Sequence, residues 1–465
     1  MSKQGKVFLV GAGPGDIELL TIKGKRVLEQ ADVIIIDRLV NPHLLMEANN
    51  QAKVIYCGKQ PCKHTLRQED IQIEMLIHAK KGKQVVRLKG GDPAVFGRVG
   101  EEAAFLKKNG VAYEIVPGVT SGIAASMYAG VPVTHRDYST SFAVVTGHCH
   151  NQLGKPKVNW QALAQSVDTI LFYMGISEIE TITTELIDKG KSAQTPVLVI
   201  QWGTYSRQKT VEGTLSNIHR KVKSAKVKNP AMIVVGDIVS MREKFSWFSQ
   251  KPYSGWGILT FTKEETPLMT TFRENGADLY RYSLSILKNG EVTMDVVHAA
   301  FKASPQQGIV FSETIHVRAF IQKLVELGYD IRELQAPLLA GTTEVLKEFN
   351  RYGFQVDFAE EQKHLMHIRI GCDSSTEPLS PVTKMAISRL LEEGHVNALL
   401  CESEEELRAL EHCFQEIRFQ GFSAPLKLLI NNVETNAVNH FSEKWNVEVI
   451  DLLNMEENLL TLHSI

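Results

Sequence analysis

The sequence has no apolar run that approaches the roughly 18–20 residues of a membrane-spanning helix. Near the N-terminus, the apolar stretch VFLV (7–10) is followed at once by glycines and an aspartate, so it is too short for the core of a signal peptide. The six cysteines are scattered and form no C-x-x-C pair, which argues against a disulfide framework and for reduced thiols. These absences predict a cytoplasmic protein without membrane segments.

The chain also lacks a large net charge, since 51 Lys and Arg stand against 53 Asp and Glu. Residues 1–250 nevertheless carry 32 basic and 22 acidic residues, whereas 251–465 carry 19 and 31. A basic first half suits an anionic partner. Charge alone does not distinguish a nucleic acid from a small polyacid, and two differently solvated surfaces would give the same counts. The basic run 219–229 has no interleaved aromatic residues, so we predict no nucleic-acid binding there.

Segments rich in β-branched residues alternate with helical patterns along the chain. Apolar runs such as VIII (33–36) predict strands that are covered by helices on both faces, and hence an α/β protein. A length of 465 residues predicts two or three domains. A break at Pro117-Gly118 and an aperiodic stretch at 246–257 divide the chain. The predicted parts are two α/β subdomains at 1–116 and 117–246, a linker at 247–256, and a further α/β region at 257–465.

The stretch VFLVGAGPGDIELL (7–20) resembles a glycine-rich dinucleotide loop. Gly11 and Gly13 fit the pattern G-x-G-x-x-G, but Asp16 stands at the third glycine position and Gly15 comes one residue early. Asp37 follows at the distance expected of the acid that binds a ribose. A tight strand-to-helix turn with Asp16 as the helix N-cap explains the same residues. This loop alone leaves both interpretations open, including a nicotinamide-dependent oxidoreductase.

Four further strand ends finish in small residues: RLKGGDPAVFGR (87–98), VPGVTSG (116–122), YMG (173–175) and QWGT (201–204). Glycine lets the backbone approach a ligand closely. A phosphate cradle needs one such loop at a helix N-terminus, whereas a larger, folded, mostly uncharged ligand needs several. The pattern therefore favours a ligand such as S-adenosylmethionine over a nucleotide phosphate.

These motifs, together with DVIIIDRLV, YCGK, PVTHRDY, VTGH, FYMG and NPAMIVVGD, stand in order over about residues 5–245. In this part the chain resembles the uroporphyrinogen-III C-methyltransferases of the tetrapyrrole methylase family. The resemblance implies a homodimer in which two α/β subdomains enclose S-adenosylmethionine in a cleft. It also implies that the first loop is not a pyrophosphate site.

The resemblance further implies the transfer of two methyl groups to uroporphyrinogen III. The products are precorrin-2, a precursor of sirohaem or cobalamin, and S-adenosylhomocysteine. Positioning does most of the work when an enamine-like carbon attacks a sulfonium methyl, and a carboxylate base then accepts a proton. By the same resemblance Asp37 is the proton acceptor and Lys59 the donor, although a strand-end cap and a surface lysine would explain them equally. The implied cofactor contacts are Pro14, Gly90, Gly91, Asp92, Val95, Thr120, Ser121, Met174, Gly203 and Ala231.

Uroporphyrinogen is an octacarboxylate, which suits the basic first half of the chain. Basic residues at strand ends or loops beside the matched motifs are candidates for binding its acetate and propionate arms, since arginine can hold a carboxylate with two parallel hydrogen bonds. We expect two or three of them to do so and the rest to form structural ion pairs. The candidates are Arg87, Lys89, Arg98, His135 and Arg136.

The segment GHCHN (147–151) resembles a metal-binding cluster. His148 and His150 share a face if the segment is extended, but Cys149 points away. Nothing nearby completes four ligands, so we predict no metal site.

From residue 253 onwards the chain has a fainter likeness to uroporphyrinogen-III synthase, carried by GIVFS (308–312) and LLAGTTEVLKEFNRYGFQVDF (338–358). It predicts a two-lobed α/β synthase-like domain. The segment ALLCESEEEL (398–407) is acidic, however, and would repel an octacarboxylate. Two hypotheses stay open: a bifunctional enzyme with synthase activity, or a methyltransferase joined to a catalytically silent docking or dimer-supporting module.

Overall fold

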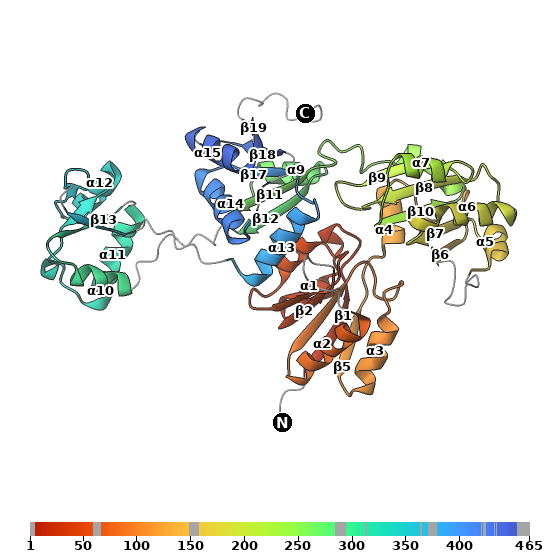
Figure 1. The fold of residues 1–465 in the computed structure, drawn as a ribbon, viewed down its shortest axis with the longest axis horizontal. Coiled ribbons are helices and arrows are strands. Elements are labelled where there is room, and N and C mark those ends of the chain that lie inside the picture. Colours follow the sequence, from red (N-terminus) through yellow and green to blue (C-terminus); the bar gives the residue numbers. More distant parts are fainter. Residues whose placement is uncertain are drawn as a thin grey trace. The chain divides into compact units, whose positions relative to one another are not determined.

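The structure, a computed structural model, forms two compact units (Figure 1), Met1–Tyr282 with Ser380–Ile465 (unit 1) and Ser283–Leu379 (unit 2). No helix among the described residues is long and apolar enough to cross a membrane. The described residues are 5–58, 67–147, 158–283, 294–311, 314–362, 365–370, 379–419, 421, 425–431, 433 and 435–452.

The first sheet of unit 1 is parallel throughout, with the order β3-β2-β4-β1-β5. All four residues of β2 are buried, as expected for a parallel strand with helices on both faces. Its strands are β1 Lys6–Gly11, β2 Val33–Ile36, β3 Lys53–Tyr56, β4 Gln84–Lys89 and β5 Ala112–Val116. Its helices are α1 Ile22–Glu29, α2 Gln68–Lys80 and α3 Val99–Lys108, with 3₁₀ turns η1 Ile17–Leu19 and η2 Pro42–Glu47.

The second sheet is mixed, with the order β6-β7-β10-β8-β9. Only β6 and β7 run parallel, while β10 pairs antiparallel with both β7 and β8. Its strands are β6 Phe142–Thr146, β7 Thr169–Tyr173, β8 Pro196–Gln201, β9 Lys209–Thr214 and β10 Ala231–Val235. The helices are α4 Ser121–Tyr128, α5 Trp160–Ser166, α6 Ile179–Asp188, α7 Ile218–Ser224 and α8 Arg242–Phe245, with 3₁₀ turns η3 Ile176–Glu178 and η4 Asp237–Met241.

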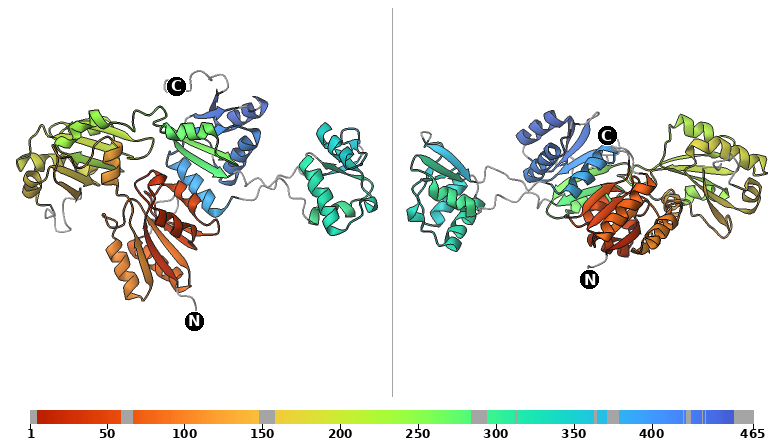
Figure 2. Two further views of the ribbon diagram at one scale, coloured as in Figure 1. Left: turned by 180° about the vertical axis from the view of Figure 1, so that it is seen from behind. Right: turned by 60° about the horizontal axis from the view of Figure 1, so that its bottom comes forward.

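The third sheet of unit 1 has the order β12-β11-β17-β18-β19, so strands from 257–283 lie beside strands from 398–451. Figures 1 and 2 show these green and blue segments in one layer. The strands are β11 Gly257–Thr262, β12 Asp278–Ser283, β17 Ala398–Cys401, β18 Leu426–Ile430 and β19 Val447–Asp451. The helices are α9 Pro267–Glu274, α13 Pro381–Glu392, α14 Glu404–Glu416 and α15 Thr435–Trp445.

Unit 2 contains a parallel sheet of order β15-β14-β13-β16. Phe311, Phe320 and Phe349 are fully buried in its core. Its elements are α10 Met294–Lys302, β13 Gln307–Phe311, α11 Thr314–Leu327, η6 Ile331–Glu333, β14 Leu338–Ala340, α12 Thr343–Arg351, β15 Asp357–Phe358 and β16 Met366–Ile370. The predicted α/β fold class is therefore confirmed in both halves of the chain.

The segment 247–256, which we predicted to be a linker, is packed against unit 1. Phe248 and Tyr253 are buried, and the Trp247 indole donates to the carbonyl oxygen of Met127 at 3.2 Å. The rings of Trp247 and Phe248 also pack against Tyr128, with centroids 5.0 and 4.9 Å apart, so aromatic contacts help to hold this segment in place.

Candidate active site

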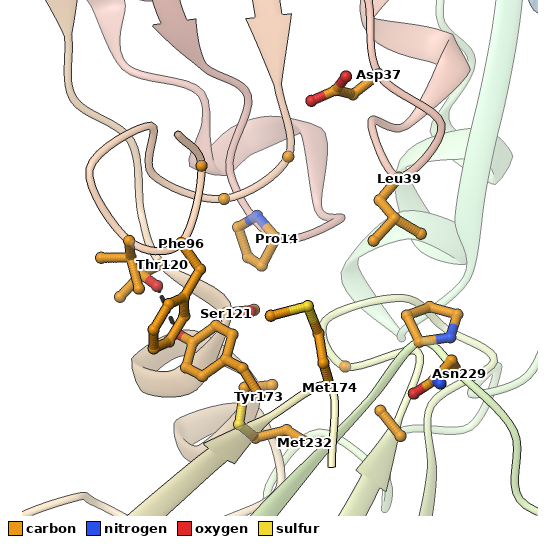
Figure 3. A pocket seen from close by; sticks show the side chains of 18 of the residues that line it. Pro14, Asp37, Leu39, Phe96, Thr120, Ser121, Tyr173, Met174, Asn229 and Met232 are labelled. Carbon is orange, nitrogen blue, oxygen red and sulfur yellow. Dashed lines mark hydrogen bonds between the residues drawn. The ribbon is translucent and has the colours of Figure 1, made fainter. Parts of the chain in front are cut away.

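The two predicted α/β subdomains, 1–116 and 117–246, both contribute residues to one pocket with a volume of about 990 Å³. The first subdomain supplies the residues that follow β1, β2 and β4. The second supplies the start of α4, the ends of β7 and β8 and the start of β10. Figure 3 shows Pro14 and Met174 pointing into the same space, with Asp37 and Leu39 at one end and Met232 at the other. The pocket therefore joins groups from loops far apart in the sequence.

Three glycine-containing turns on the first-subdomain side lie backbone against backbone. The amide of Gly91 donates to the carbonyl oxygen of Gly13 at 2.7 Å, and Gly91 has a φ of +69°. A Cβ on Gly11 would lie 2.7 Å from the Cα of Gly118. Asp92 closes the arrangement, because its Oδ2 accepts from the Gly118 amide at 2.9 Å. A Cβ does not fit at Gly11 or Gly118, and the positive φ of Gly91 favours glycine at that position.

The first glycine loop ends in a helix cap. Asp16 is the N-cap of η1, and its Oδ1 accepts from the Glu18 amide at 2.9 Å. Its Oδ2 accepts from the Tyr128 hydroxyl of α4 at 2.7 Å. Of the two interpretations of this loop, the capped turn is the one observed.

Asp37 lines the pocket and is bonded to a buried charge network. The Arg87 guanidinium, only 2% exposed, donates to the Asp37 carboxylate and to Glu102. Lys89 Nζ donates to both Glu102 oxygens at 3.0 Å. Glu102 is fully buried, so one carboxylate in the first turn of α3 serves two cations of β4.

Burial, together with the neighbouring Arg87 charge, lowers the pKa of Lys89. Burial also raises the pKa of the pocket-lining Cys57 to about 11, which keeps this group a thiol at neutral pH. Sequence reasoning missed Glu102, although Arg87 and Lys89 share a face of one strand and predict a buried acid opposite them.

Tyr173 and Phe96 form an aromatic wall that sequence reasoning also missed. The Tyr173 hydroxyl lies 2.5 Å from the Thr120 Oγ1 (Figure 3) and accepts from the Gly122 amide at 2.6 Å. The Phe96 ring packs edge-on against Tyr173, with centroids 5.2 Å apart. Phe96, Met174 and Trp202 all have φ between +52° and +55°. Such conformations are costly for non-glycine residues and cluster at ligand sites.

The predicted site residues fall into distinct groups. Asp37 and all ten candidates for cofactor contact line the pocket. Lys59 lies outside the described residues. The ten are Pro14, Gly90, Gly91, Asp92, Val95, Thr120, Ser121, Met174, Gly203 and Ala231.

Of the five basic candidates, the pocket includes Lys89 alone. Arg87 is buried behind Asp37. Arg98 is exposed and pairs with Glu101, one turn along α3, at 2.6 Å. The His135 ring accepts from the Asp137 amide at 3.2 Å. Neither His135 nor Arg136 lines the pocket. Arg38, which we did not select although it follows Asp37 directly, does line it.

No group of three or more His, Cys, Asp or Glu side chains suited to a metal ion occurs in the parts of the chain that are described. His148, Cys149 and His150 of the segment discussed above lie outside those parts.

The fold and the pocket define an α/β protein whose two subdomains share one large ligand site. The family model "Tetrapyrrole (Corrin/Porphyrin) Methylases" matches residues 6–219. A uroporphyrinogen-III C-methyltransferase of Bacillus subtilis is 46% identical over 356 residues, which is 76% of this chain and 73% of that protein. One of Priestia megaterium is 53% identical over 236 residues, or 51% of this chain and 99% of that protein. The chain belongs to the tetrapyrrole methylase family, and the resemblance inferred from its motifs is confirmed.

A solved structure of uroporphyrin-III C-methyl transferase from Thermus thermophilus, complexed with S-adenyl homocysteine, is 38% identical. The match covers 50% of this chain and 99% of the chain in that structure, with a TM-score of 0.44. The family model ends at residue 219, and these matches do not support a synthase in the C-terminal half. That likeness stays a prediction.

Proposed function

We propose that this chain transfers two methyl groups from S-adenosylmethionine to uroporphyrinogen III and forms precorrin-2. The observation that carries the proposal is the shared pocket, in which Asp37 and the glycine turns line one volume. The relatives support the choice of substrate, since those at 46–53% identity are named uroporphyrinogen-III C-methyltransferases.

The pocket fits the cofactor in size and surface. Its volume of about 990 Å³ is at the upper end of the range for small-molecule sites. A Cβ on Gly91 would meet no atom closer than the Ser121 amide nitrogen at 3.8 Å, so the backbone there is open to a ligand. When bound, S-adenosylmethionine supplies an electrophilic methyl group. The ten pocket residues named above are the proposed contacts, with Met174 and Met232 as apolar surface.

Asp37 is the proposed proton acceptor. Methylation of a pyrrole carbon leaves a cation that must lose a proton, and a carboxylate at the pocket end can accept it. Arg87 donates to Asp37 from the buried side and so orients its carboxylate. Lys59, which is outside the described residues, stays the predicted donor.

Arg38 and Lys89 are the proposed contacts for substrate carboxylates, because both line the pocket. Lys89 would do so while its Nζ also donates to Glu102. Arg87, Arg98, His135 and Arg136 hold neighbouring protein groups or lie off the pocket, and we assign them no carboxylate. A homodimer and a role in the route to sirohaem or cobalamin complete the proposal. A relative from Chromobacterium violaceum, 44% identical over 252 residues and covered over 53% of its length, is named a siroheme synthase.

For the C-terminal half we propose a catalytically silent module. At the carboxyl edge of the third sheet, Glu402 accepts from Thr266 Oγ1 at 2.5 Å and from Asn431 Nδ2 at 3.2 Å. Glu406 accepts from the Glu402 amide at 2.7 Å. Glu402 and Glu406 thus accept hydrogen bonds from neighbouring residues and make this edge of the sheet negatively charged. A negatively charged edge is unsuited to a substrate with many carboxylates, because like charges repel.

The proposal is tested by incubating the purified full chain with uroporphyrinogen III and S-adenosylmethionine. We expect a product that carries two added methyl groups and the release of S-adenosylhomocysteine, both followed by mass spectrometry. An unmethylated substrate, with an active relative as the positive control, would overturn it.

The silent module is tested separately with hydroxymethylbilane in the absence of S-adenosylmethionine. After oxidation, the isomers are separated by chromatography. We expect only the spontaneous type I isomer. An excess of type III would instead establish a synthase in the C-terminal half.

A further inference from the structure

One segment of the C-terminal part of unit 1 contacts loops that line the methylase pocket. It is residues 389–395, which we call the 389–395 turn. It comprises the end of α13 and the residues that lead towards β17. Figures 1 and 2 show α13 beside the first sheet, and Arg389 is only 4% exposed. An arginine so deeply buried must be matched by acceptors.

Two acceptors of Arg389 belong to the loop that follows β2. Its Nη2 donates to the carbonyl oxygen of Arg38 at 2.8 Å and to that of Val40 at 3.3 Å. Its guanidinium lies 4.4 Å from the centroid of the Tyr56 ring, at the end of β3. Arg389 thereby fixes the backbone at Arg38 and Val40, on the two sides of Leu39. This segment follows Asp37 directly.

A second arginine reaches the same turn from the other subdomain. Arg207 Nη1 donates to the carbonyl oxygens of Glu393 and Gly394, both at 2.8 Å. Its guanidinium stacks on the Trp202 ring at 3.7 Å. The rings of Trp202 and Tyr205 pack against His395, with centroids 5.6 and 5.1 Å apart.

The 389–395 turn is cross-linked within itself. Arg389 Nε donates to Glu393 Oε1 at 2.9 Å, and Glu393 also lies 3.4 Å from the His395 ring nitrogen. Charge-assisted bonds of this kind are among the stronger hydrogen bonds in proteins. The turn thus joins the two loops through a short, bonded path.

Both loops are walls of the pocket. Arg38 and Leu39 line it from the first subdomain, and Trp202, Gly203 and Tyr205 line it from the second. Small misplacements of such walls cost reactivity, since methyl transfer depends on the alignment of the two reactants.

We propose that the 389–395 turn sets the separation of the two pocket walls, with Arg389 and Arg207 as positioning residues. The C-terminal half then supports methyl transfer without chemistry of its own. The kinetic readout of this inference rests on the proposed function, whereas its structural readout does not.

The test compares Arg389→Met with wild type in the full chain. Methionine keeps an unbranched apolar side chain but removes every donor. Loss of bonds from a charged donor predicts about a tenfold fall in kcat/KM for methylation and weaker binding of S-adenosylhomocysteine by calorimetry. Hydrogen exchange should speed up in residues 38–44 and also in 202–208, across the turn. A merely local packing role would not change exchange in the second segment.

Arg408→Met is the matched control. Arg408 lies on α14 in the same part of unit 1 and pairs with Glu404 at 2.8 Å on the surface, so we expect wild-type kinetics and exchange. If Arg389→Met does not fold, Arg389→Lys carries the test, because lysine keeps the charge but cannot serve both carbonyls with a planar fork. It should lower kcat/KM at an unchanged circular dichroism spectrum.

Wild-type kinetics, affinity and exchange at both segments in a folded Arg389 variant would overturn the inference. If the wild-type chain itself does not methylate, the proposed function fails. The exchange comparison still decides the inference in that case, since it needs no substrate.

Discussion

Asp37 lies where the pocket meets the buried charge network. Its carboxylate lines the pocket and accepts a hydrogen bond from the Arg87 guanidinium. The carboxylate is therefore accessible to a ligand and also fixed in orientation. Arg87 in turn depends on Glu102, which it shares with Lys89. The proposed catalytic group, Asp37, and the buried acid Glu102 are thus linked through Arg87. Substitution of each one separately distinguishes an effect on catalysis from an effect on stability.

Replacing Asp37 with asparagine should lower kcat for methylation by about a hundredfold or more, because the base is lost. Binding of S-adenosylhomocysteine should stay close to that of wild type. Steady-state kinetics and calorimetry measure the two effects. Asp137→Asn is the control, since the Asp137 side chain is 70% exposed and lies off the pocket; an equal loss in both variants would contradict the assigned role.

Replacing Glu102 with glutamine should destabilise the protein by roughly 3 kcal/mol, because Lys89 and Arg87 would lose a buried counter-charge. Denaturation by urea, followed by circular dichroism, measures the change. The adjacent Glu101→Gln should change stability by less than about 0.5 kcal/mol, since Glu101 is 55% exposed and pairs only at the surface. Equal effects of the two substitutions would rule out the buried network as the cause.

The elements of the first subdomain meet the pocket through their turns, not through long side chains. The turns after β1, β4 and β5 are in direct backbone contact at Gly11, Gly91 and Gly118. This contact is possible only because β1 lies between β4 and β5 in the sheet. The positions of these three strands in the sheet therefore determine where their turns lie at the pocket.

Gly118→Ala should disturb this contact. Its Cβ would overlap the carbonyl oxygen of Gly91 and lie 2.9 Å from the Gly11 carbonyl carbon, so the turns must separate. We expect destabilisation of about 1–3 kcal/mol and weaker S-adenosylhomocysteine binding, measured by urea denaturation and calorimetry. Gly100→Ala on α3 is the control, because a Cβ there meets no atom within 4 Å; unaltered affinity in Gly118→Ala would refute the argument.

Across unit 1 as a whole, buried polar groups join the methylase part to the third sheet. Asp278 of β12 accepts from the Ser206 amide and hydroxyl, both at 3.0 Å. Burial raises the pKa of Asp278 from 3.8 to about 6, although the Ser206 hydrogen bonds oppose this. His43 packs edge-on against Tyr280 of β12, and burial lowers the pKa of His43 to about 4.

These pKa shifts predict opposite pH dependences. The folded state holds the Asp278 proton more tightly than the unfolded state, so this group's contribution to stability falls as pH rises from about 4 to 6. His43 is the opposite case, because the unfolded state holds its proton more tightly than the folded state. Its contribution to stability therefore increases as the pH rises from about 4 to 6.5.

The experiment therefore measures the difference between Asp278→Asn and wild type. We expect the variant to gain relative stability by roughly 2 kcal/mol between pH 4 and pH 6, from urea denaturation at a series of pH values. A difference that does not change with pH would show that Asp278 is not buried as described. His43→Gln serves as the opposite control, since it should lose relative stability over the rise to pH 6.5.

The sequence alone predicted the α/β class, because strand runs and helical patterns are local features. The cofactor candidates came from the family resemblance, and all ten of them line the pocket. The sequence predicted the basic residues poorly. Charge type does not reveal whether a partner is a substrate or a buried acid such as Glu102.

What the sequence by itself determined is the order of strands, helices and glycine turns, since hydrophobic period and turn chemistry act over a few residues. Only the tertiary structure decided which distant groups pair. Arg389 donates to the carbonyl oxygen of Arg38, 351 positions away in the chain. Trp247 and Phe248 of the segment 247–256 pack against the Tyr128 ring, and no local sequence period predicts these contacts. Such contacts depend on the assembled sheets, because a side chain's partner is set by the fold around it and not by its neighbours in sequence.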